Sequence, residues 1–160
     1  MNIISLPILF PLVLITLLIV IKSPIITKWI GIVGSFSLFV LTLFIFRQVT
    51  IEKILVVQVG GWEAPFGISL VIDYLSGILL MVSNFIVFTI SIFAYRYVKL
   101  EGAFSKFYIC FFSLTMGVNG AFITGDVFNL YVWFEVMLLS SFVLITMGNQ
   151  KAQLEGGIKY

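Results

Sequence analysis

One acidic residue lies deep inside a long apolar segment. Glu135 is the ninth residue of a run over 127–147 that holds no other charge. The rise of a helix places it about 12 Å from the start of that run, near the middle of a bilayer. An ionised carboxylate at that depth is costly unless it is paired or hydrated. A carboxyl group that gains and loses its charge as a neighbour or water moves can carry a proton, and we predict this role for Glu135.

The surroundings of Glu135 leave a second interpretation open. No Lys or Arg lies inside any of the long apolar segments, so a counter-charge has to come from water, another subunit or chain beyond these residues. A protonated Glu135 could instead hydrogen-bond two helices together. Its helical neighbours at steps of three, four and seven residues are mostly apolar: Phe128, Tyr131, Val132, Leu138, Leu139 and Phe142.

Three further polar residues lie close to this segment. Asp126 follows Gly125 in a short break between two apolar runs, where its carboxylate is expected to cap the helix that follows. The alternative for Asp126 is a role in proton or cation access. Asn119 and Asn129 are candidates for the same ion path, although hydrogen bonds between helices are the commoner use of such residues.

Composition excludes several classes of protein. The 160 residues are 61% hydrophobic and only 10% charged, they include no His, and the one cysteine is Cys110. Imidazole metal sites, catalytic triads and an intrachain disulfide are therefore excluded. A net charge of +2 gives no reason to expect nucleic acid as a partner. We predict no cofactor and no metal site, and we expect a membrane protein rather than a soluble enzyme.

Five apolar runs are long enough to cross a bilayer as helices. The predicted fold class is an all-α membrane protein, a polytopic transmembrane helix bundle with the start of a sixth helix at about 153–160. All of residues 1–160 are assigned to one membrane domain. Two glycine pairs, Gly31 with Gly34 and Gly117 with Gly120, are expected to allow close helix packing. The predicted spans are 3–21, 29–46, 74–95, 107–124 and 127–147.

Basic residues are unevenly divided between the loops. The loops 22–28 and 96–106 and the segment after 147 hold seven of the nine Lys and Arg residues, whereas Arg47 and Lys53 are the only ones on the other side. Cytoplasmic loops are enriched in Lys and Arg. We therefore expect the loops 22–28 and 96–106 to be cytoplasmic and the amino terminus to be outside.

The outer loop after the second span contains two β-prone stretches. Residues 54–59 and 66–72 are apolar and partly β-branched, and Gly60 and Gly61 supply turn residues between them. This pattern predicts a short β-hairpin. Its expected role is structural, and Trp62 and Phe66 could dock on the bundle or on a partner.

Several segments resemble a known family. GDVFNLYVWFEVMLLSSFVLI (125–145) and QLEGGIKY (153–160) resemble the antiporter-like proteins shared by complex I membrane subunits and multisubunit cation/proton antiporters. GGWEAPFGI (60–68) looks more narrowly like the D-type subunits of Mrp (Mnh) sodium/proton antiporters. The resemblance implies that Glu135 handles protons together with a lysine of a later helix. It also implies that Lys159 starts the sixth helix. The position of Lys159 at the cytoplasmic mouth leaves two roles open: a relay lysine, or an interface lysine whose side chain reaches toward the membrane surface.

The resemblance carries further expectations. Members of this family have many more helices than this chain holds, so we expect an N-terminal fragment that does not exchange ions alone. The implied partners are the lipid bilayer, other antiporter subunits, protons and sodium or another monovalent cation, in a bacterial plasma membrane. Two alternatives are a proton-pumping subunit of complex I or a membrane hydrogenase, and a structural subunit that transports nothing.

Overall fold

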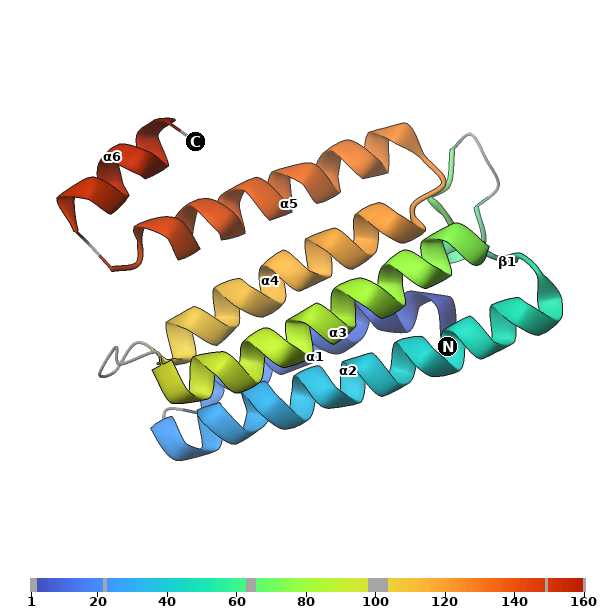
Figure 1. The fold of residues 1–160 in the computed structure, drawn as a ribbon. Coiled ribbons are helices and arrows are strands. Elements are labelled where there is room, and N and C mark those ends of the chain that lie inside the picture. The colour runs from blue at the N-terminus through green and yellow to red at the C-terminus, as the bar shows by residue number, and fades with distance from the viewer. Residues whose placement is uncertain (1–2, 22, 63–65, 98–103, 149, 160) are drawn as a thin grey trace.

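The computed structural model describes residues 3–21, 23–62, 66–97, 104–148 and 150–159. Five helices run side by side as a bundle, and a sixth, short helix turns back beside α5 (Figure 1). All five long helices have the length and apolar composition needed to cross a membrane, so the expected multi-pass helical fold is confirmed. The helices are α1 Leu6–Val20, α2 Pro24–Glu52, α3 Tyr74–Tyr97, α4 Phe104–Ile123, α5 Val127–Thr146 and α6 Lys151–Lys159.

The helix bounds differ from the predicted spans mainly at α2. This helix has 29 residues and continues past the predicted 29–46 at both ends, because a polar residue such as Arg47 ends an apolar run without ending a helix. α6 begins two residues before the predicted 153. Lys22, the segment 98–103 with Lys99, and Tyr160 lie outside the described residues. The orientation predicted from loop charges therefore stays a prediction.

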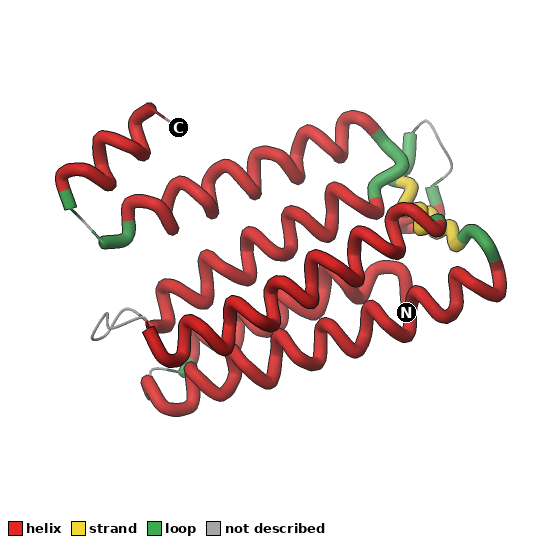
Figure 2. Tube along the Cα trace, in the orientation of Figure 1, coloured by secondary structure: helices red, strands yellow, loops and turns green. Residues whose placement is uncertain are grey.

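The predicted β-hairpin is confirmed at one end of the bundle. Strands β1 (Leu55–Gln58) and β2 (Ser69–Ile72) pair antiparallel, with Leu55 opposite Ile72 and Gln58 opposite Ser69. Figure 2 shows the two strands at the end of the bundle where α4 turns into α5. The hairpin is part of the packed interior there, because three of its side chains join five from the helices in one apolar cluster. The buried members of this cluster are Ile4, Ile45, Val49, Leu55, Leu70, Ile72, Leu80 and Ile123.

The start of α3 is fixed by a reciprocal cap. The amide of Ser76 donates to Asp73 Oδ1 at 2.8 Å, and the amide of Asp73 donates to Ser76 Oγ at 2.8 Å. This exchange satisfies two of the free amides that every helix start leaves. The backbone and hydroxyl hydrogen bonds from Ser76 hold the pKa of the Asp73 carboxyl below its ordinary value.

Candidate functional site

The orientation of Glu135 follows from how α5 packs on α4. The indole of Trp133 lies where a Cβ on Gly120 would be, and a Cβ on Gly117 would lie 2.7 Å from Met137 Cγ. Both glycines therefore leave room for α5 side chains, as expected from the sequence. Trp133 and Met137 flank Glu135 by two residues, and two residues correspond to about 200° around a helix. Glu135 is thus turned away from α4.

The Glu135 side of α5 is not covered by any described part of the chain. Glu135 itself is exposed, and so are the aromatic residues near it, including Phe128 at 75% and Tyr131 at 60%. An ionisable side chain in a membrane-spanning helix usually faces other protein or a water-filled cavity, because lipid does not solvate a bare charge. The charge of the Glu135 carboxyl group therefore depends on what lies against this face.

Glu135 has one polar neighbour among the described residues. Tyr131, one helical turn earlier, interacts with its carboxyl group. The only ion pair found in the described ranges joins Lys151 to Glu155 at 4.0 Å, on the exposed surface of α6. Within this part of the chain, Glu135 thus has Tyr131 as a neutral neighbour and forms no ion pair. Its charge state depends on whatever lies against the uncovered face.

Lys159 lies on α6, which packs beside the carboxyl-terminal part of α5. It is the exposed last residue of α6. That helix packs back on α5 where Gly157 meets Thr146, with a Cβ position 2.6 Å from Thr146 Cγ2 and 3.5 Å from the ring of Phe142. Phe142 is seven residues from Glu135, which is about 10 Å along α5. Because α6 runs back along the carboxyl-terminal end of α5, Lys159 lies on the way toward Glu135, but the two residues do not form an ion pair.

Asp126 caps α5 as predicted from the sequence. Its two carboxylate oxygens accept hydrogen bonds from the amides of Phe128 at 3.1 Å and Asn129 at 3.2 Å. Asn129 is buried, and its Nδ2 donates to Thr124 Oγ1 at 2.9 Å, which closes the turn between α4 and α5. Both side chains therefore build the start of α5. A role for either one in an ion path stays a prediction.

Asn119 is fully buried in a network that joins three helices. Its Nδ2 donates to the carbonyl of Pro7 at 3.0 Å, and its Oδ1 accepts from Asn84 Nδ2 at 2.9 Å. The carbonyl of Pro7 needs this donor because its usual partner four residues on is Pro11, which has no N–H. Asn119 thus replaces a missing helix bond of α1 and ties α4 to α1 and α3. Its predicted part in the ion path remains untested.

Sequence reasoning missed Asn84 and the position of Trp133. Asn84 is the one amide side chain of α3, and it is fully buried. A lone Asn in an apolar span opposite the lone Asn of the next span was the signal that could have found this pair. For Trp133 the signal was its spacing from Met137. Residues four apart lie on one face of a helix, and this face of α5 packs on the two glycines of α4.

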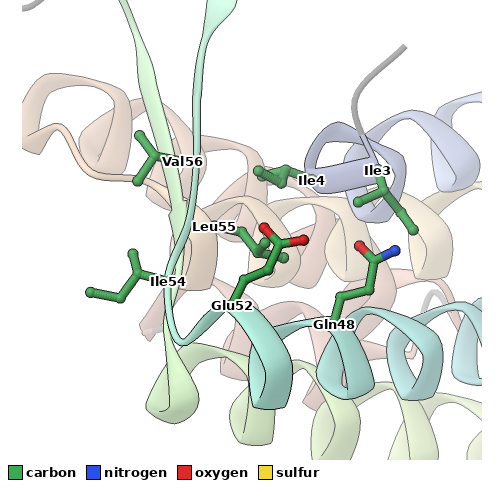
Figure 3. Close-up of a pocket in the computed structure, with 7 residues that line it drawn as sticks. All are labelled: Ile3, Ile4, Gln48, Glu52, Ile54, Leu55 and Val56. Atoms are coloured by element: carbon green, nitrogen blue, oxygen red, sulfur yellow. The ribbon is translucent and has the colours of Figure 1, made fainter.

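A pocket at the hairpin end is lined by a second acidic side chain, Glu52. Figure 3 shows Gln48 and Glu52, one turn apart at the end of α2, with their polar groups directed toward the start of the chain. No group of three potential metal ligands occurs there or elsewhere among the residues described. The pocket is separate from Glu135. Its lining consists of Ile3, Ile4, Gln48, Glu52, Ile54, Leu55 and Val56.

Comparison with known proteins gives relatives by sequence. No family model matches the chain. The D-type subunit of the Na⁺/H⁺ antiporter of Alkalihalophilus pseudofirmus is 36% identical over 160 residues, which are 99% of this chain and 32% of that protein. This chain therefore spans about a third of the length of that curated relative.

Solved structures share the fold. A chain of the membrane-bound sulfane sulfur reductase, an archaeal respiratory membrane complex, matches 98% of this chain over 33% of its own length, with a TM-score of 0.92 and 27% identity. A chain of the Mrp complex from Dietzia sp. DQ12-45-1b matches 91% of this chain over 28% of its own length, with a TM-score of 0.73 and 24% identity. By its sequence along nearly its whole length, this chain is a relative of the D-type subunits of sodium/proton antiporters.

Proposed function

We propose that the protein containing this chain is the D-type subunit of a multisubunit antiporter that exchanges sodium or another monovalent cation for protons. Glu135 is the proton carrier. One observation carries this assignment: Glu135 lies in the middle of a membrane-spanning helix, on its uncovered face, with Tyr131 as its neighbour and no cation beside it in the described part of the chain. Such a group changes its charge when its surroundings change.

The proposed cycle uses this dependence. A proton reaches Glu135 through transient water and neutralises it. When a positive charge approaches the uncovered face of α5, the ionised form is stabilised and the proton is released. Movement of the cation in the opposite direction is coupled to that change. Lys159 is a candidate for the approaching charge or for a relay, since α6 carries it along α5 from the far end.

The proposed setting is a bacterial plasma membrane, with the protein bound to other antiporter subunits. We propose that the hairpin end, and with it the amino terminus, lies outside, and that the loops 22–28 and 96–106 are cytoplasmic. The distribution of basic residues supports this orientation. Lys28 lies near the start of α2, Arg96 in the last turn of α3 and Lys106 in the first turn of α4, all at the end of the bundle away from the hairpin.

The test is sodium-dependent collapse of a pH gradient in everted vesicles that contain the full-length assembled complex. Glu135→Gln keeps the shape of the side chain but cannot ionise, so we expect exchange to be lost at unchanged complex abundance. Glu52→Gln is the matched control, because Glu52 lies at the hairpin end of α2 and away from α5. Normal exchange by Glu135→Gln would contradict the assignment and would leave Glu135 as a structural residue.

A second candidate is a proton-translocating subunit of a respiratory membrane complex. The TM-score of 0.92 with a chain of the sulfane sulfur reductase favours it. Glu135 would serve in the same way, but electron transfer in a partner would drive it. An imposed sodium gradient without an electron donor discriminates the two. Proton movement under that gradient supports the antiporter, and movement only with an electron donor supports the respiratory complex.

A further inference from the structure

Little of the surface of α5 is buried among the described residues. Only 11% of its membrane-spanning residues are buried, compared with 44% for α4. α5 packs along α4 and against α6, and most of its remaining surface is uncovered within the described residues. The depth of Glu135 therefore depends on two things: the packing of α5 along α4, and how the start of α5 is held.

The start of α5 is attached to the hairpin through the main chain. The amide of Gly125 donates to the carbonyl of Ser69 at 2.8 Å, and Thr124 forms an antiparallel bridge with Leu70. The turn between α4 and α5 thus extends the edge of β2. Asn129 donates to Thr124 Oγ1 at 2.9 Å, which links the first turn of α5 to the same bridge.

The hairpin is in turn anchored in the bundle. Leu70 is 3% exposed and Ile72 is fully buried, and both belong to the apolar cluster formed with α2, α3 and α4. A strand held in this way is a fixed support rather than a loose loop. The path from the core to Glu135 therefore runs through β2, the turn and the first two turns of α5.

Gly125 allows the turn to come this close. A Cβ at position 125 would lie 3.0 Å from Val71 Cγ2 and 3.3 Å from the carbonyl oxygen of Ser69. Its backbone φ is not in the left-handed region, so a side chain there is restricted by the close neighbours and not by the backbone conformation. A larger residue at position 125 must push the turn away from β2.

We propose that the hairpin is a positioning element for α5: the Ser69–Gly125 hydrogen bond and the Leu70–Thr124 bridge fix the start of α5 and with it the depth of Glu135, while the packing of Trp133 and Met137 on α4 sets its rotation. This inference rests on the proposed function, since it assigns a role to the hairpin in the proton step. Gly125 and the main chain of Ser69 are positioning residues, and they do not touch the proton themselves.

A graded series at Gly125 tests the proposal in the full-length assembled complex. Gly125→Ala requires shifts of a few tenths of an ångström, and we expect a small loss of exchange. Gly125→Val requires a larger displacement, and we expect exchange to fall by tenfold to about a hundredfold with a shifted pH profile, because small misplacements of a reacting group are costly. Gly156→Ala is the matched control, since nothing lies within 4 Å of a Cβ there, and it should exchange normally.

A cross-link tests the same contact without removing it. The 3.0 Å separation between the position-125 Cβ and Val71 Cγ2 suits a disulfide between cysteines at these positions. We expect Val71→Cys with Gly125→Cys to cross-link on mild oxidation and to keep the exchange rate and pH profile of its reduced form. Each single cysteine variant is the control. Loss of exchange on oxidation, restored by a reductant, would overturn the proposal, because the hairpin would then have to move.

The two proposals fail in different ways. If Gly125→Val assembles and keeps the wild-type rate and pH profile while Glu135→Gln is inactive, the positioning role of the hairpin is wrong and the proton carrier stands. If Glu135→Gln exchanges normally in the same vesicles, the proton carrier is wrong. A Gly125→Val variant that does not assemble leaves the oxidised cysteine pair as the deciding measurement.

Discussion

α4 and α5 are antiparallel neighbours of equal length, each with 20 residues. Asn119 of α4 and Glu135 of α5 differ in burial and in their interactions. Asn119 of α4 is fully buried, and both atoms of its amide group are hydrogen-bonded to other helices. Glu135 of α5 is exposed and interacts with Tyr131 of its own helix.

The difference separates a structural polar residue from one suited to chemistry. A buried amide with satisfied hydrogen bonds has a fixed state, and moving it would leave partners such as Pro7 unpaired. A carboxyl group on an uncovered face has a state that its surroundings can change. In a membrane helix the exposed carboxyl group is therefore the candidate for proton transfer, whereas the buried amide stabilises the packing of the bundle.

The largest expected effect on stability is at Asn119. Asn119→Leu leaves the carbonyl of Pro7 unpaired in the core and removes the α4 partner of the Asn84 amide, which keeps its bond to the carbonyl of Leu80. This loss should cost about 2–4 kcal/mol. We expect a lower melting temperature of the complex in detergent, with exchange retained per assembled complex. The double variant with Asn84→Leu should recover part of the loss, since both members of the amide pair are then apolar. Loss of exchange at full stability would instead place Asn119 in the ion path.

The next effect concerns the contact between the two helices. Gly120→Val places a branched side chain where the indole of Trp133 lies, and overpacking of this kind costs about 1–3 kcal/mol. We expect α5 to be displaced, and both the melting temperature and the exchange rate to fall. Gly156→Val is the matched control, because nothing lies within 4 Å of a Cβ there. Unchanged behaviour of Gly120→Val would show that α5 is held mainly by its start.

A smaller effect is expected at the cap of α5. Asp126→Ala removes the acceptor for Phe128 and Asn129, and loss of such a cap costs about 0.5–2 kcal/mol. Asp126→Asn keeps an acceptor without the charge, so we expect it to restore most of the melting temperature and normal exchange. If Asp126→Asn is stable but exchanges poorly, the charge of Asp126 belongs to the ion path.

The smallest expected effect is a pH-dependent change in stability at the cap of α3, which lies apart from the contact between α4 and α5. The pKa of Asp73 is lowered by Ser76, so the ionised cap stabilises the folded state above the ordinary pKa of about 3.9. That contribution is lost as the pH falls through the lowered value. We expect Asp73→Asn to be less stable than wild type at pH 7 by under about 1 kcal/mol and to match it at strongly acidic pH. A difference in stability between Asp73→Asn and wild type that grew as the pH fell would contradict this prediction.

Much of the fold follows from local sequence. Apolar runs long enough for a bilayer can satisfy their backbone only as helices, and the β-prone stretches around Gly60 and Gly61 allow little except a hairpin. Asp126 was predicted as a cap because it directly precedes an apolar run. Glu135 could be identified because a charge in such a run is costly wherever the helix packs.

Only the tertiary structure decided how these elements meet. The sequence placed Glu135 at a depth, but its rotation away from α4 depends on Trp133 and Met137 fitting over two glycines. The bond from Asn119 to Pro7 joins residues that are 112 positions apart, and the bridge from Leu70 to Thr124 joins the hairpin to α5. Composition and periodicity describe one helix or strand at a time, whereas these contacts arise from how distant segments share space, and that is settled only when they pack.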